Sequence, residues 1–128
     1  MLTDSELISI NWTDEARSTI MVHLPACWTG EEFSHTYATA HTMMREVPHM
    51  VHLITQLPPK FVIPPQFLLR LPAIVGEIPP NSGVHAVVGG GKLAHTLFHI
   101  VRRVHPQIVS RVILVDRVED AYAHLATR

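Results

Sequence analysis

Three consecutive glycines followed by a lysine, Gly89-Gly90-Gly91-Lys92, form the segment of this sequence best suited to binding an anion. Backbone N–H groups of a glycine turn before a helix can hold a phosphate, and a lysine adds positive charge. The segment lacks P-loop spacing, because Leu93 follows the lysine where serine or threonine is required. It also lacks the third glycine of a dinucleotide fingerprint. We therefore expect mainly a tight turn with positive φ, and keep Gly90, Gly91 and Lys92 as candidate anion contacts.

Ten histidines raise the question of a metal site. His95 and His99 lie four residues apart, so they share one face of a predicted helix. A zinc site needs three or four ligands, and no glutamate lies between these two histidines. The sequence therefore predicts neither a metal site nor a cofactor.

A nucleophilic centre has equally little support. No Gly-x-Ser-x-Gly motif is present. Cys27 precedes a predicted helix whose N-terminus can lower the pKa of a thiol, but we expect a small, partly buried and inert cysteine. The adjacent acidic pairs fit a turn and the first turns of two helices: Asp14-Glu15, Glu31-Glu32 and Glu119-Asp120. We assign no catalytic residue and expect the protein not to be an enzyme.

The elements that carry these residues follow from the spacing of apolar side chains. Residues 7–12 and 19–24 have strand periodicity, and their short connection predicts an antiparallel hairpin. Thr29 and Glu32 form a predicted capping box, which starts a helix that ends before Pro48. This helix has one apolar face: Phe33, Tyr37, Ala40 and Met44.

The rest of the chain alternates strands and helices. Short apolar runs predict three more strands: residues 50–57, 84–88 and 112–115, the second of them buried on both faces. Three more helices are predicted: residues 65–76, residues 92–105, and a last helix that Asp116 caps with Glu119 three residues later. We expect Pro72 to break or kink the helix at 65–76.

Helical spacing also predicts which side chains of these helices are buried. In the helix at 65–76 they are Phe67, Leu68, Leu71, Ile74 and Val75. In the helix at 92–105 they are Leu93, Leu97, Ile100, Val101 and Val104. In the last helix they are Tyr122 and Leu125.

The element order ββαβαβαβα predicts one α/β domain over residues 1–128, with a single mixed five-stranded sheet and about four helices. Alternating strands and helices imply right-handed parallel crossovers, and the first hairpin adds an antiparallel edge. The 128 residues are 47% hydrophobic and 16% charged, so the chain can bury a core without disulfides or metals.

Composition also limits the classes of partner. A net charge of −1 gives nucleic-acid binding no support. No apolar run reaches the roughly 20 residues that cross a bilayer, so we expect no membrane insertion. A start without basic residues and a single cysteine lead us to expect a cytoplasmic protein without a signal peptide. Acids dominate residues 1–47 and bases dominate residues 83–117, an asymmetry that can steer a protein partner or a second copy of the chain.

Four segments of the chain resemble the SpoIIAA-like family of small bacterial proteins: Trp12-Thr13-Asp14, Trp28-Thr29-Gly30-Glu31-Glu32-Phe33, Val87-Val88-Gly89-Gly90 and Val115-Asp116-Arg117-Val118-Glu119-Asp120-Ala121. That family is related in fold to STAS domains and to the CRAL-TRIO lipid-binding domain. The resemblance implies helices packed on a mixed sheet and a non-catalytic interaction or regulatory domain. Some STAS domains are switched by phosphorylation after the third strand, but residues 55–60 contain no serine or aspartate, so we predict no phosphorylation site.

Three functions remain open at this point. The first is a non-catalytic protein-interaction domain whose partner is another protein or, as a homodimer, a second copy. The second is a binding protein for a lipid or small apolar ligand, covered by the proline-bracketed segment Phe61–Val75, which ordinary helix packing also explains. Trp12 and Trp28 fit either a binding surface or packing. The third is an enzyme that uses an anion or a phosphorylated metabolite at the glycine turn.

Overall fold

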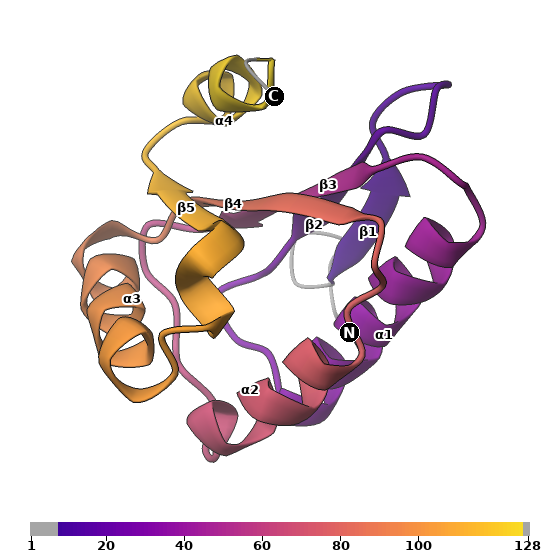
Figure 1. Ribbon diagram of the computed structural model, residues 1–128. Helices are drawn as coiled ribbons and strands as arrows, with labels where there is room; N and C mark the ends of the chain where they lie inside the picture. The colour runs from indigo at the N-terminus through magenta and orange to yellow at the C-terminus, as the bar shows by residue number, and fades with distance from the viewer. Residues whose placement is uncertain (1–7, 127–128) are drawn as a thin grey trace, which may run out of the picture.

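The computed structural model describes residues 8–126, apart from the side chains of residues 75 and 76. It contains one five-stranded sheet with helices on both faces (Figure 1). Leu7, predicted to begin the first strand, and the side chain of Val75, predicted to be buried, lie outside the described residues.

The strands lie side by side in the order of the sequence: β1 (Ser9–Trp12), β2 (Thr19–His23), β3 (Val51–Leu57), β4 (Ser82–Gly89) and β5 (Val112–Val115). β1 pairs with β2 antiparallel, and β2 to β5 are parallel to one another. The predicted mixed sheet, with its antiparallel hairpin at one edge and parallel crossovers elsewhere, is confirmed.

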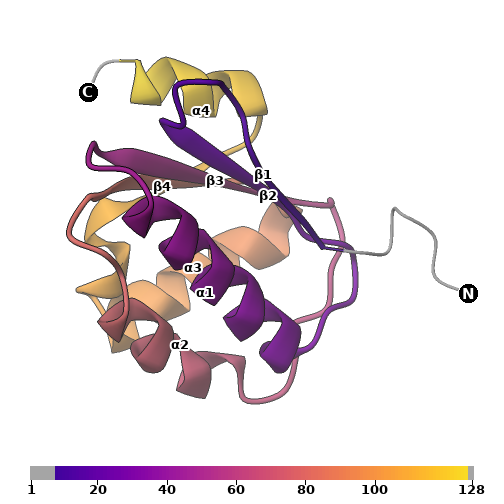
Figure 2. The ribbon, with the colours of Figure 1, turned by 90° about the vertical axis from the view of Figure 1, so that its right-hand side faces the viewer.

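Three of the four helices share one face of the sheet: α1 (Gly30–Arg45), α2 (Phe67–Gly76) and α3 (Gly91–Val104). Each connects two neighbouring parallel strands, and crossovers of one hand that advance in one direction place their helices on the same face. The short 3-10 helix η2 (Ile108–Arg111) lies on this side too, while α4 (Val118–Leu125) covers the opposite face (Figures 1 and 2).

The capping box fixes the start of α1. The Thr29 hydroxyl accepts a hydrogen bond from the Glu32 backbone N–H at 3.0 Å, and the Glu32 carboxylate accepts one from the Thr29 N–H at 2.8 Å. α1 ends at Arg45, before Pro48, and its predicted apolar face is buried against the core. α1 is therefore a firmly placed helix that directs Tyr37 toward the sheet.

β4 divides its side chains between the two faces of the sheet, as the period of two in a strand requires. Val84, Ala86 and Val88 pack with Ala121 and Leu125 of α4. His85 and Val87 point to the other face, toward α1, α2 and α3, where both line a pocket. This interior strand is therefore covered on both sides.

Of the two outcomes expected at Pro72, a break or a kink, the break is wrong. The helix continues through it to Gly76. Proline removes one backbone hydrogen bond from the helix, and Pro72 itself lies on the exposed side of α2. Phe67 and Leu71 are buried and hold α2 against the core.

The buried face predicted for α3 is wrong at three of its five positions, since Leu93, Ile100 and Val104 are 38%, 41% and 57% exposed. Val101 is buried as predicted, Leu97 is partly buried against the core, and Ala94 is buried as well. The apolar residues of α3 span a wider arc than the sheet below it can cover. The helix packs on one side of that arc, and the remainder faces outward.

The start predicted for the last helix is also wrong. Arg117, not Asp116, occupies the N-cap position of α4, and no side chain caps it. The inward residues are then Ala121 and Leu125, four apart, and Tyr122 is 43% exposed. The smaller alanine permits the close approach of α4 to the sheet.

Candidate functional site

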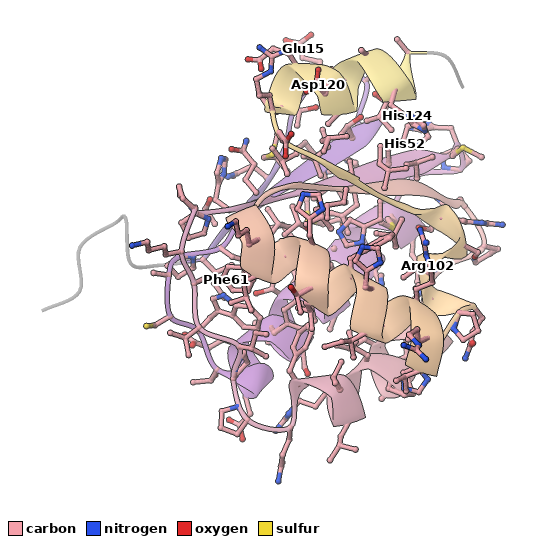
Figure 3. All side chains as sticks on the ribbon, turned by 90° about the vertical axis from the view of Figure 1, so that its left-hand side faces the viewer. Glu15, His52, Phe61, Arg102, Asp120 and His124 are labelled. Atoms are coloured by element: carbon pink, nitrogen blue, oxygen red, sulfur yellow. The ribbon has the colours of Figure 1, made fainter. Side chains whose placement is uncertain are left out.

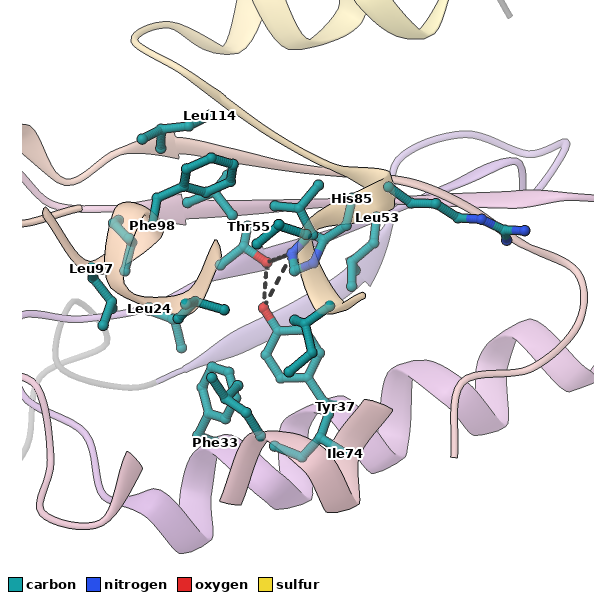
Figure 4. Close-up of a pocket in the computed structure, with 18 of the residues that line it drawn as sticks. Leu24, Phe33, Tyr37, Leu53, Thr55, Ile74, His85, Leu97, Phe98 and Leu114 are labelled. Carbon is teal, nitrogen blue, oxygen red and sulfur yellow. Dashed lines mark hydrogen bonds between the residues drawn. The ribbon is translucent and has the colours of Figure 1, made fainter. Parts of the chain in front are cut away.

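A pocket of about 210 Å³ lies between the sheet and the helices α1, α2 and α3 (Figure 4). Its lining is predominantly apolar and comes from every element on that side of the sheet, including η2 and β5. Within the described lining, polar side chains are confined to Trp28, Tyr37, His41, Thr55, Ser82, His85 and Arg111. Such a concave apolar space with few polar groups is typical of a small-molecule site.

One wall of the pocket comes from the proline-bracketed segment and the helix after it. Phe61, Phe67, Leu71 and Ile74 all line the space, and the first three are buried. Phe61 lies in the irregular stretch between β3 and α2 (Figure 3). The segment thus covers the pocket from the side opposite the sheet.

Aromatic rings form one end of the lining. The Trp28 ring stacks on Phe33 with 5.2 Å between centroids and meets Phe67 edge-on at 5.5 Å. Phe33 in turn lies 4.5 Å from the Tyr37 ring. Trp28 is therefore largely a packing residue, only 7% exposed, whereas Trp12 is half-buried on β1.

Tyr37, Thr55 and His85 form a hydrogen-bonded cluster on the wall of this pocket (Figure 4). The Tyr37 and Thr55 hydroxyl oxygens are 2.5 Å apart, and the Thr55 oxygen is 2.8 Å from Nε2 of His85. Tyr37 Oη and His85 Nε2 are 3.4 Å apart. Tyr37 belongs to α1, Thr55 to β3 and His85 to β4, so the cluster ties the helix to the sheet.

His41 lies one helical turn after Tyr37 and completes a group that we name the polar wall: Tyr37, His41, Thr55 and His85. Burial lowers the pKa of His85 to about 4, and the nearby His41 contributes. Burial, with help from Arg45, also lowers the pKa of His41, and burial raises the pKa of Tyr37. Each member of the polar wall is consequently uncharged at neutral pH.

Two buried polar atoms of the described residues make no hydrogen bond: Nε1 of Trp28 and Nδ1 of His41. Both residues line the pocket. A buried polar group without a partner is unusual in a folded protein, because its desolvation is not compensated. Both unpaired polar atoms therefore belong to residues that line the pocket.

The turn at Gly89-Gly90-Gly91 requires glycine at each position for steric reasons. Gly89, Gly90 and Gly91 have φ of 83°, 81° and 57°. A Cβ atom at Gly89 would lie 2.6 Å from the Leu57 carbonyl oxygen. A Cβ atom at Gly90 would lie 2.5 Å from that of Ala94. These contacts support the tight turn, and the anion contact at Gly90, Gly91 and Lys92, where α3 begins, stays a prediction.

The remaining candidates are not gathered into a site. His95 lies 3.9 Å from the Asp116 carboxylate, and within residues 8–126 no three His, Cys, Asp or Glu side chains are grouped to hold a metal ion.

Cys27 is exposed, not partly buried as predicted, because the loop before α1 turns it outward. Asp14 accepts hydrogen bonds from Ser18 in the β1–β2 turn. The other acidic pairs lie in the first turns of α1 and α4.

The sequence did not identify the residues of the polar wall as a site. In the sequence, Tyr37 belongs to an apolar helix face, and Thr55 and His85 fall within apolar strands. The available signal was the position of the two strand residues, because a histidine and a threonine inside buried strands need polar partners. A tyrosine four residues from a histidine on the facing helix could have supplied such partners.

No helix among the described residues has both the length and the apolar composition that a membrane span requires. The four segments on which the predicted family resemblance rests lie at the β1–β2 turn, the start of α1, the end of β4 and the start of α4, and the resemblance stays a prediction. No family model, curated protein or solved structure matches the chain.

Proposed function

We propose that this protein binds a small apolar molecule in the pocket between the sheet and the helices α1, α2 and α3. The pocket itself carries the proposal, because its 210 Å³ are lined mainly by apolar side chains. An apolar cavity of roughly 150 Å³ holds benzene in an engineered protein, so this pocket accommodates a somewhat larger molecule. Covering its lining with an apolar ligand removes that surface from water, which is favourable.

Filling the pocket tests this proposal. Val87 points into it from β4, so a Val87→Phe substitution places a ring where the ligand would lie. We expect the variant to fold with undiminished thermal stability, because the ring fills existing space, and to lose at least tenfold in affinity for 1-octanol. Ligand-observed NMR and thermal shift would measure binding, and a ligand at 100 times its Kd adds about 2.7 kcal/mol of stability.

The matched control is Val62→Phe. Val62 is 59% exposed and is not among the pocket residues, so the same change there should leave 1-octanol binding intact. Equal binding by the wild type and Val87→Phe would contradict the proposed site. Failure of the wild type to bind 1-octanol or any of a panel of small apolar compounds would contradict the function.

A second candidate function is protein interaction, favoured by the outer face of α3. Leu93, Ile100 and Val104 are exposed at helical spacing and form one apolar stripe. Arg102 (Figure 3) and Arg103 add positive charge to the exposed surface of this helix. The Arg102 guanidinium lies 5.3 Å from the centre of the Phe98 ring. An apolar stripe beside positive charge suits a protein partner with an apolar, acidic surface, and the acidic first turn of α1 in a second copy offers one.

Ile100→Lys tests this second candidate by placing a charge in the stripe. If copies of the chain associate through α3, the wild type should show a dimer mass by light scattering at micromolar concentration, and Ile100→Lys a monomer mass. Leu69→Lys on α2, at a residue 78% exposed, is the matched control and should remain dimeric. A wild type that is monomeric throughout, or an Ile100→Lys dimer, would exclude association through this stripe.

A further inference from the structure

Resting on the proposed function, we infer that the ligand is an uncharged molecule whose hydroxyl, or a similar group that both donates and accepts, lies against the polar wall. This requirement defines the chemical class of the ligand. It distinguishes apolar alcohols and related neutral molecules from fatty acids and amines of equal length.

The distribution of charge around the pocket favours an uncharged ligand. Its described lining contains no aspartate, glutamate or lysine. Arg111 is the one residue there that is charged at neutral pH, but its side chain is exposed and its guanidinium donates to the Ser82 carbonyl at 2.9 Å. A carboxylate or ammonium group inside the pocket would therefore lose its hydration without gaining a counter-ion at the polar wall.

The side chains of the polar wall can hydrogen-bond a ligand group that both donates and accepts. Tyr37 and Thr55 carry hydroxyl groups, and a neutral imidazole has one donor and one acceptor nitrogen. Nδ1 of His41 has no partner, and it belongs to the same face of α1 as Tyr37. A hydroxyl can donate or accept, so it matches His41 in either tautomer.

The remaining lining of the pocket is predominantly apolar. Apolar side chains surround the cluster, among them Leu24 of the loop after β2 and Leu97 and Phe98 of α3 (Figure 4). They suit a hydrocarbon body that extends away from a single polar end. A pocket with a single polar region and an otherwise apolar lining orients a ligand that has one polar group.

A matched ligand series provides the first test, using the full chain at pH 7.5. We expect 1-octanol to bind at least tenfold more tightly than octanoate or octylammonium in ligand-observed NMR titrations. Octanoate binding as tightly as 1-octanol would overturn the inference. If Arg111→Gln then abolished octanoate binding, a carboxylate site at Arg111 would replace it. Binding of ethylbenzene but none of 1-octanol would also overturn it while leaving the proposed function standing.

Thr55→Val tests the polar wall itself, because valine keeps the shape of threonine and removes the hydroxyl. We expect affinity for 1-octanol to fall about fivefold, the effect of one hydrogen bond, while affinity for ethylbenzene stays unchanged. Thr42→Val is the control, since the Thr42 hydroxyl bonds the Ala38 carbonyl on the exposed side of α1. Equal losses for both ligands would overturn the role of the polar wall. The ligand series on the wild type decides the question of charge even if this variant does not fold.

Discussion

Lowering the pH from 7 to 4 is expected to reduce the free energy of unfolding by about 3 kcal/mol through His85 alone. Burial lowers the pKa of His85 in the folded protein to about 4, against 6.5 for an unperturbed imidazole. Between these two values the unfolded chain binds a proton that the folded protein does not. Stability is therefore unaffected by His85 above pH 6.5 and falls as the pH drops from 6.5 toward 4.

Urea unfolding at pH 7 and pH 4 would measure this effect in the wild type and in His85→Gln. Glutamine stays uncharged, so the loss of stability between the two pH values should shrink by about 3 kcal/mol in the variant. His35→Gln, at an exposed residue of α1, should leave the wild-type loss unchanged. An equal loss in the wild type and His85→Gln would show that the pKa of the half-buried His85 ring is not lowered in the folded protein.

Gly89→Ala is expected to destabilise the fold by about 3 kcal/mol. Gly89 has φ of 83°, which an L-residue adopts only at a cost. The new Cβ would also lie 2.6 Å from the Leu57 carbonyl oxygen, which is part of the backbone of β3. Neither strand can move without disturbing the parallel pairing of Leu57 with Gly89.

Gly30→Ala provides the control for that substitution. A Cβ there would meet Nε of Arg70 at 2.6 Å, but this atom belongs to a flexible side chain that can move away. Alanine also favours the helix that begins at this residue. Chemical unfolding should therefore show a change below about 1 kcal/mol for Gly30→Ala. Similar losses in both variants would contradict the steric account of the glycine turn.

Local signals explain which parts of the fold were predictable. The capping box at Thr29 and Glu32 involves atoms three residues apart, so the sequence alone identifies it. The same holds for strand β5, whose predicted and observed bounds agree. The buried face of α3 depends instead on where the sheet ends beneath it. No spacing within residues 91–104 carries that information.

The site was less predictable than the fold, because its members are distant in sequence. Tyr37 and Thr55 are 18 residues apart, and Thr55 and His85 are 30 apart. Their contact depends on the register of β3 against β4, in which Leu53 lies opposite His85. A shift of that register by one residue would turn His85 to the face of α4. Hydrophobic periodicity cannot define such a register across an α-helical connection.

Alternate side chains of β4 point to opposite faces of the sheet, so the pocket lining can change without changing the packing on the other face. Residues 85 and 87 contact the pocket, whereas the packing under α4 uses their neighbours Val84, Ala86 and Val88. If the pocket binds a ligand as proposed, exchanging side chains on this one face of β4 should change which ligand is preferred. Such substitutions leave the packing between β4 and α4 unchanged, so the fold tolerates changes in the pocket lining.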